Sequence, residues 1–328
     1  MLASGSMDTR QSILAWLERT GHGTREMREL EGDVSVRRYF RVQLDDETSA
    51  IVALYPAEIR QACSNFLATN RLLQGVDVPV PEVLAADCDE GLMLMNDLGP
   101  GTLYDHRDDP WDALLPYLQQ AIDYADRIRS LPLEEVSALN PALDEDLLWH
   151  ELEQTWRLCL QPWGVLDGKG FAAELWGALH DLCRHLGSES PVPCHRDFMA
   201  RNLVPVSPHP TLVVLDHQDL RSGPRFYDLA SLLNDSLFVP ETIEEELTEQ
   251  RLTGREQRTS YHRAATQRTL KAVGTYEAFS QRGDDRHRSL IPGTLARAIF
   301  HFQQTPEAQS VGEELLHRLR PLLPDDDG

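Results

Sequence analysis

The spacing of apolar residues divides the chain into a sheet-forming first part and a mainly helical second part. Alternation of apolar with polar or charged residues predicts a strand at 34–42, and short apolar runs between polar turns predict three more antiparallel strands, at 51–55, 83–86 and 92–95. Helical spacing predicts one helix before these strands and one among them, at 9–18 and 57–74. The first 98 residues therefore read as a small antiparallel sheet with a helix inserted after its first hairpin.

Helical periodicity dominates from residue 99 onward. It predicts helices at 111–130, 143–160, 171–185, 227–237, 241–248, 256–280, 294–304 and 306–319. The stretch 192–216 interrupts this pattern with two short strands around a turn at 207–210. We therefore predict an α+β, bilobal fold, with an N-terminal lobe at 1–98 and a helical C-terminal lobe at 99–328.

Composition limits the classes of partner. The chain has 328 residues, with 31 Lys and Arg against 53 Asp and Glu and a formal net charge of −22. Such a charge repels phosphate backbones and anionic lipids, so we expect neither a nucleic acid nor a membrane partner. No apolar run approaches the ~20 residues needed to span a bilayer. The sequence does not indicate the oligomeric state.

The cysteines and the first residues indicate a cytoplasmic protein. The five cysteines are widely spread without a C-x-x-C pair, so we expect them to be reduced, with no disulfide frame and no structural zinc site. Residues 1–7 lack the pattern of a signal peptide. They read either as native residues or as an expression-tag remnant before a native Met7, and we leave them out of the fold prediction.

One motif carries recognisable chemistry. His195-Arg196-Asp197 is followed by Asn202 with the spacing H-R-D-x-x-x-x-N, and Asp216 ends an apolar strand 14 residues later. Phosphoryl transfer requires Mg²⁺ beside the transferred phosphate and a group that orients the acceptor hydroxyl. We expect Asn202 and Asp216 to bind Mg²⁺ through oxygen and Asp197 to act as the base. H-R-D alone also occurs as a helix cap or ion pair, but the full spacing favours phosphoryl transfer.

The motif and its surroundings resemble the aminoglycoside phosphotransferase and choline kinase family, a branch of the protein-kinase-like fold. The similarity extends over nearly the whole chain and is strongest at residues 97–99, 195–202, 215–219 and 223–233. It implies ATP and Mg²⁺ as cofactors and a small-molecule hydroxyl as acceptor. It also implies structural roles for His195, near the metal-binding Asp, and for Asp228, which ties the following helix to the catalytic loop or simply caps that helix.

Within this family the chain is similar to the bacterial anomeric kinases of N-acetylmuramate and N-acetylglucosamine, which act in peptidoglycan recycling. Residues 35–42, 95–99, 215–219 and 227–231 carry this similarity. An amino sugar is therefore the first expected acceptor. An aminoglycoside or a choline-like amino alcohol remains the alternative.

The nucleotide-binding part departs from the family pattern. The kinase sequence V-A-I-K is replaced by Val-Ala-Leu-Tyr at 52–55, so Tyr55 stands in the position of the phosphate-binding Lys. Arg37 or Arg38 is the expected replacement, since Arg binds phosphate through two parallel hydrogen bonds. Both also read as solvated strand residues. We further expect the backbone near Ser35 to cover the phosphates, and the hinge with Met95, Asp97 and Leu98 to contact adenine.

The acceptor site is the least defined by the sequence. Polar residues near the motif that are candidates for acceptor binding, or for plain solvated and capping roles, are Asp219, Asn234, Asp235, Asp146 and His150. The missing Lys leaves one further alternative, a pseudokinase that binds nucleotide without transferring phosphate. The presence of Asp197, Asn202 and Asp216 argues against it.

Overall fold

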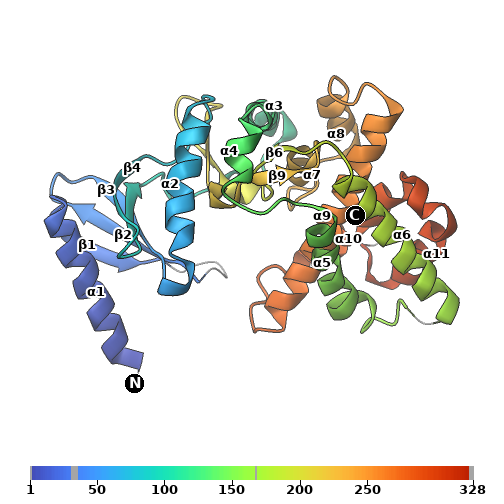
Figure 1. The fold of residues 1–328 in the computed structure, drawn as a ribbon, viewed down its shortest axis with the longest axis horizontal. Helices are drawn as coiled ribbons and strands as arrows, with labels where there is room; N and C mark the ends of the chain where they lie inside the picture. Colours follow the sequence, from blue (N-terminus) through green and yellow to red (C-terminus); the bar gives the residue numbers. More distant parts are fainter. Residues whose placement is uncertain (1, 31–35, 167, 325–328) are drawn as a thin grey trace. The chain divides into compact units, whose positions relative to one another are not determined.

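The computed structural model describes residues 2–30, 36–166 and 168–324, which form two compact units (Figure 1). The first comprises Met1–Gly75, Pro79–Pro100 and Val213–Asp219, and the second comprises Val76–Val78, Gly101–Leu212 and Leu220–Gly328. The segment at 213–219 thus belongs with the N-terminal part, although more than one hundred residues separate it from Pro100 in sequence. The sheet and the helical remainder confirm the predicted α+β class.

The first unit contains a five-stranded antiparallel sheet in the order β1-β2-β3-β5-β4. The strands are β1 (Thr24–Glu29), β2 (Arg38–Leu44), β3 (Ser49–Leu54), β4 (Val83–Asp87) and β5 (Leu92–Asn96). The sequence analysis missed β1, because Met27 is its only apolar residue and the alternation is hidden among charges. The predicted strand at 34–42 begins later, at Arg38, among the described residues.

The two faces of this sheet are covered by different helices (Figure 1). Helix α1 (Leu2–Arg19) places Trp16 against Val52 and Leu94, whereas α2 (Gln61–Gln74) places Phe66 on the other face with Met93. Successive residues of a strand point to opposite faces, so β5, which is apolar and buried from Leu92 to Met95, can pack against both helices. Burial of each large apolar side chain stabilises the unit by about 1.5–3 kcal/mol.

One cysteine pair contradicts the expectation of reduced cysteines. Cys63 of α2 and Cys88, just after β4, form a disulfide with their Cα atoms 5.5 Å apart. The expectation was wrong for this pair because 25 residues separate the two cysteines in sequence and only the packing of α2 beside the sheet brings them together. Cys159, Cys183 and Cys194 are free and buried.

The second unit is mainly helical. Its helices are α3 (Trp111–Arg129), α4 (Leu133–Ser137), α5 (Glu145–Thr155), α6 (Lys169–Gly187), α7 (Tyr227–Leu233), α8 (Glu241–Thr248), α9 (Arg255–Ser280), α10 (Ile291–Gln303) and α11 (Gly312–Leu319). The predicted helix at 143–160 is α-helical only to Thr155 and continues as a π-helical turn, Trp156–Leu160. No helix in the described part of the chain is both long and apolar enough to cross a bilayer.

Short strands surround the predicted catalytic loop. They are β6 (Val192–Cys194), β7 (Leu203–Pro205), β8 (Leu212–Val214) and β9 (Arg221–Gly223), with β6 paired to β9 and β7 to β8. The sequence analysis found the interruption of the helical pattern here but missed β9 and the short helix α4. Both are too short to produce a clear periodicity.

Helix α9 crosses α5 at a close approach that requires glycine. A Cβ atom on Gly274 would lie 2.9 Å from the backbone N and Cα of Thr155. Thr155 also donates a 2.6 Å hydrogen bond to the carbonyl of Leu270, one turn earlier on α9. This contact fixes the position of α9 relative to α5, and both helices contribute residues to the site described below.

We predict opposite effects for two glycine substitutions in helices. Gly274→Ala should lower the free energy of unfolding by about 1–3 kcal/mol, because the new methyl group overpacks the crossing with α5. Gly177→Ala, in α6, should raise it by about 0.5–1 kcal/mol, because no atom lies within 4 Å of the new Cβ. Chemical denaturation of both variants measures the difference. A Gly274→Ala variant as stable as Gly177→Ala would contradict the close approach.

Candidate active site

The loop that contains Asp197 is attached to the second unit through a buried carboxylate. Asp228, in the first turn of α7, accepts hydrogen bonds from the backbone N–H groups of His195 at 2.7 Å and Arg196 at 2.9 Å. These bonds hold Arg196 in the left-handed region at φ 76°, which a non-glycine residue rarely adopts. This geometry is the tie between helix and loop that the family resemblance implies for Asp228.

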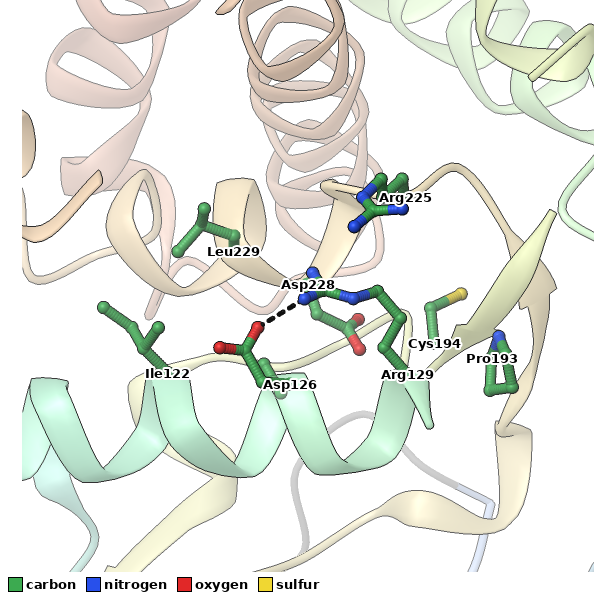
Figure 2. A pocket seen from close by; sticks show the side chains of 9 residues that line it. Ile122, Asp126, Arg129, Pro193, Cys194, Arg225, Asp228 and Leu229 are labelled. Carbon is green, nitrogen blue, oxygen red and sulfur yellow. Dashed lines mark hydrogen bonds and ion pairs between the residues drawn. The ribbon is translucent and has the colours of Figure 1, made fainter. Parts of the chain in front are cut away.

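The surroundings of Asp228 are closely packed (Figure 2). Asp228 and Cys194 line a cavity of about 10 Å³, beside the Asp126–Arg129 ion pair of 2.8 Å. Burial raises the pKa of Asp228, and its hydrogen bonds and the charge of His195 offset only part of that effect. The buried Asp228 carboxylate therefore stabilises the loop from the interior of the second unit, away from bulk water.

Asp197 lies among cations supplied by α9. Its Oδ1 atom is 3.3 Å from Nζ of Lys271 and 3.4 Å from the Arg268 guanidinium. Burial alone would raise the pKa of Asp197, but the charges of Lys271, Arg268 and Arg196 outweigh burial and hold this pKa well below its ordinary value. Asp197 is therefore ionised at neutral pH.

Glu151 of α5, which the sequence analysis missed, is the last member of this group. The Asp197 group consists of Asp197, Glu151, Arg196, Arg268 and Lys271. Its carboxylate accepts hydrogen bonds from Arg196 at 2.6 Å and Gln267 at 3.0 Å, and it lies 3.5 Å from Lys271. Burial would raise its pKa, yet Lys271 and Arg196 lower it below the ordinary value. Glu151 shares a helix face with buried Leu148, and a carboxylate on an apolar face was the available signal.

Asn202 is positioned by the same loop. It lies in a short 3₁₀ turn, Ala200–Asn202, and its Nδ2 donates a 2.8 Å hydrogen bond to the backbone carbonyl of Asp197. With Nδ2 used in this way, the amide oxygen is the atom that Asn202 presents to a cation. The structure thus brings Asp197 and Asn202 together within the second unit.

Asp216 belongs to the first unit, where it is paired with an arginine. Arg37 donates a 2.6 Å hydrogen bond to Oδ1 of Asp216, and Gln218 donates another of 2.8 Å. Arg37 also interacts with Tyr55, the residue in the position of the missing Lys. The buried Tyr55 side chain thus lies beside the cation that pairs with Asp216.

The two candidate arginines differ in their surroundings. The Arg37 side chain is 13% exposed, whereas Arg38 lies on β2 and donates two hydrogen bonds, of 2.7 and 2.9 Å, to Glu29 of the neighbouring strand. Of these two, Arg37 is the one oriented toward Asp216.

Helix α2 packs directly on the segment after Asp216. The Thr69 hydroxyl and Nδ1 of His217 are 2.7 Å apart, and the Phe66 ring centroid is 4.2 Å from that of His217. Both aromatic rings are buried. These contacts explain why residues 213–219 belong to the first unit.

The expected adenine contacts lie at the end of β5. Asp97 accepts hydrogen bonds from Arg41, Ser49 and the Gly99 N–H, at 3.0, 2.5 and 3.0 Å. Burial would raise the pKa of Asp97, but these bonds lower it below its ordinary value. The Asp97 side chain therefore stabilises the segment that follows β5. Met95 is buried and Leu98 is half-buried. Ser35 lies outside the described residues.

The five acceptor candidates lie in different surroundings, some buried and some exposed, and they do not all belong to the same unit. Asn234 is 1% exposed and its amide contacts His301 at 2.6 Å and Tyr261 at 2.9 Å, so its polar atoms are used within the core. Asp235 is also buried and accepts a 2.7 Å hydrogen bond from Ser236. Asp146 and His150 are exposed on α5, and Asp219 belongs to the first unit. Of these five, His150 lines a pocket beside the Asp197 group.

Two of the predicted metal-binding residues, one in each unit, have side chains of the type that binds magnesium. A carboxylate and an amide oxygen, on Asp216 and Asn202, are ligand types that Mg²⁺ prefers. Asp216 already has a cationic group, the Arg37 guanidinium, at one of its oxygens. Among the described residues no cluster of three or more His, Cys, Asp or Glu side chains has the arrangement of a metal site.

Comparison with known proteins shows the family. The profile of the phosphotransferase enzyme family matches residues 26–269. The chain belongs to the phosphotransferase enzyme family. This confirms the resemblance found in the sequence, and the matched region contains every catalytic and metal-binding candidate.

Two relatives share a name. The N-acetylmuramate/N-acetylglucosamine kinase of Pseudomonas putida is 30% identical over 302 residues, which cover 86% of this chain and 85% of that protein. The protein of the same name from Pseudomonas aeruginosa is 34% identical over 209 residues, 62% of this chain and 58% of that protein. The second match therefore spans less than two thirds of the relative.

A solved structure supports the fold. The choline/ethanolamine kinase family protein of Mesorhizobium loti superposes with a TM-score of 0.61 at 15% identity, over 96% of this chain and 99% of that one. This phosphotransferase thus has the protein-kinase-like fold that its sequence predicts.

We predict that Glu151 stabilises the protein in a pH-dependent way. Its pKa is lower in the folded than in the unfolded chain, so its contribution is present at neutral pH and is lost as the pH falls below about 4.5. Glu151→Gln should lower the free energy of unfolding at pH 7 by about 1–3 kcal/mol. Denaturation between pH 7 and pH 3.5 should show this difference shrinking.

Glu153, an exposed residue of α5 two positions after Glu151, provides the control. Glu153→Gln should change the free energy of unfolding by less than about 0.5 kcal/mol at any of these pH values. A constant difference between the wild type and Glu151→Gln from pH 7 to pH 3.5 would contradict a lowered pKa of Glu151.

Proposed function

We propose that this phosphotransferase is a cytoplasmic, ATP- and Mg²⁺-dependent kinase that phosphorylates the anomeric hydroxyl of an amino sugar, of the N-acetylmuramate or N-acetylglucosamine type. The observation that carries the proposal is the ionised Asp197 carboxylate, held by Lys271 and Arg268 in a loop with Asn202. The names of the two relatives support the choice of acceptor. A role in peptidoglycan recycling follows from that acceptor.

Asp197 would act mainly by orienting the acceptor. Its low pKa makes it a weak base but an effective hydrogen-bond acceptor, and it aims the sugar hydroxyl at the γ-phosphorus. As the new P–O bond forms, the bond to the ADP oxygen breaks and the hydroxyl proton passes late in the reaction to Asp197. A loose transition state needs little help from a strong base.

The residues of the first unit would hold the nucleotide. Asp216 together with Asn202 would bind Mg²⁺, which neutralises charge on the β- and γ-phosphates when bound. Arg37 would take the place of the missing Lys and contact a phosphate, since it is a buried cation beside Asp216 and Tyr55. The hinge around Met95, Asp97 and Leu98 would present its backbone to adenine.

A pseudokinase remains the alternative from a different functional class. The observation that favours it is Tyr55 in the position of the Lys. The orientation of Arg37 toward Asp216 argues against it, because a replacement cation is present. A choline-like amino alcohol is the alternative acceptor, since a structural neighbour belongs to a choline/ethanolamine kinase family.

An acceptor panel tests the proposal. Purified protein is incubated with ATP and MgCl₂ and with N-acetylmuramate, N-acetylglucosamine, choline or kanamycin, and ADP release is followed. We expect ADP release with the amino sugars and a parallel loss of reducing-sugar reactivity, because phosphorylation at C1 blocks the free anomeric centre. ADP release with choline or kanamycin alone would replace the acceptor, and nucleotide binding without any ADP release would favour the pseudokinase.

We predict that the two arginines behave differently in steady-state kinetics. Arg37→Ala should lower kcat/KM for ATP by about tenfold to a hundredfold, because it removes charge-assisted contacts to the nucleotide. Arg38→Ala should stay within about twofold of the wild type, because an exposed pair such as that with Glu29 contributes little. Equal effects of both substitutions would refute the assignment of Arg37.

A further inference from the structure

A pocket lies beside the Asp197 group within the second unit. It has a volume of about 620 Å³ and is lined by residues of α5, the π-helical turn, α6 and α9, and by Arg196. Two lining residues, Lys271 and Arg196, also belong to the cationic group around Asp197. One end of the pocket is therefore close to the carboxylate that would orient the acceptor hydroxyl, and its size suits a monosaccharide derivative.

The walls of this pocket combine positive charge with aromatic rings. Arg157, Arg196 and Lys271 contribute three cations against the carboxylates of Glu151 and Glu153. Arg196 and Lys271 are occupied by Glu151, and Lys271 also by Asp197. Arg157 is exposed and has no ion-pair partner among the described residues, so its charge is available to a ligand. This is notable in a chain with a net charge of −22.

The tryptophans form the apolar part of the wall. Trp156 and Trp176 line the pocket with ring centroids 4.9 Å apart and nearly perpendicular rings. Trp149 packs against Trp176 with the ring centroids 4.5 Å apart. Trp176 remains 38% exposed, so part of its side chain is accessible to a ligand in the pocket. A rigid aromatic face suits the C–H face of a sugar ring.

An uncommon backbone feature, the π-helical turn at Trp156–Leu160, places Trp156 and Arg157 on the wall of the pocket. The N–H of Gln161 donates to the carbonyl of Trp156 at 3.0 Å, five residues earlier, which is the π-helical pattern. Such turns are rare in proteins, and those that occur are often found at functional sites. The wider turn carries both Trp156 and Arg157 on the wall of the pocket. The position of the turn is fixed by the contacts of Thr155 and Cys159 with α9.

We propose that this pocket binds the acceptor and that Arg157 recognises a carboxylate on it, so that the enzyme distinguishes an acidic amino sugar from a neutral one. The sugar ring lies against Trp156 and Trp176, and the Arg157 guanidinium forms hydrogen bonds with the carboxylate of the substituent. The inference rests on the proposed function and extends it, since N-acetylmuramate has this carboxylate and N-acetylglucosamine lacks it.

The test compares the two sugars with Arg157→Gln. We expect kcat/KM for N-acetylmuramate to fall about tenfold to a hundredfold through KM, so that the ratio of kcat/KM for the acidic sugar over the neutral sugar falls at least about tenfold. Arg157→Lys should recover part of the ratio. Trp176→Leu should raise KM for both sugars, because the ring does not sense charge. Calorimetric titration of each variant with N-acetylmuramate, without nucleotide, gives the same ranking through Kd.

Arg255→Gln is the matched control, because Arg255 is exposed at the start of α9 and lines none of this pocket. It should leave the ratio unchanged. If Arg157→Gln leaves the ratio unchanged, or lowers kcat/KM for both sugars equally, the role of Arg157 is refuted while the proposed function stands. If the wild type phosphorylates neither sugar, the proposed function fails and this inference fails with it.

Discussion

The site depends on one electrostatic arrangement, the ionised carboxylate of Asp197 among the cations of Lys271, Arg268 and Arg196. A buried carboxylate without partners would be protonated, which would make it a weaker hydrogen-bond acceptor and unable to take up the proton of an acceptor hydroxyl. The cations come from the loop itself and from α9, whose position is set by the crossing with α5 at Gly274. The packing of two helices in the second unit therefore determines the protonation state of the residue expected to orient the acceptor.

Much of the fold was predictable because it follows periodicity. The alternation in β2, the apolar runs of β3 and β5 and the apolar stripe of α3 are strong local signals. Elements whose signal is weak were missed, such as β1, with a single apolar residue, and the two short elements α4 and β9. The disulfide could not be foreseen, since Cys63 and Cys88 meet only through tertiary packing.

The candidate site likewise contains residues that the sequence indicates and residues that it does not. Asp197, Asn202 and Asp216 are candidates from the sequence alone, because one loop and one strand end carry them at a recognisable spacing. Glu151, Arg268 and Lys271 were not, because they lie on α5 and α9 and approach Asp197 only after the helices pack. The sequence likewise does not separate Arg37 from Arg38, whose different ion-pair partners, Asp216 for Arg37 and Glu29 for Arg38, appear only in the structure. Asn234 shows the converse error, since a polar residue near the motif proved to be part of the core.

The most direct test of the account is the kinetic effect of Asp197→Asn, measured together with the dissociation constant for ATP and Mg²⁺. The substitution keeps the size of the side chain and removes its charge. The account predicts that kcat falls about 10²–10⁴-fold while nucleotide affinity stays within about threefold of the wild type. A folded Asp197→Asn protein with wild-type kcat would contradict the central role of this carboxylate.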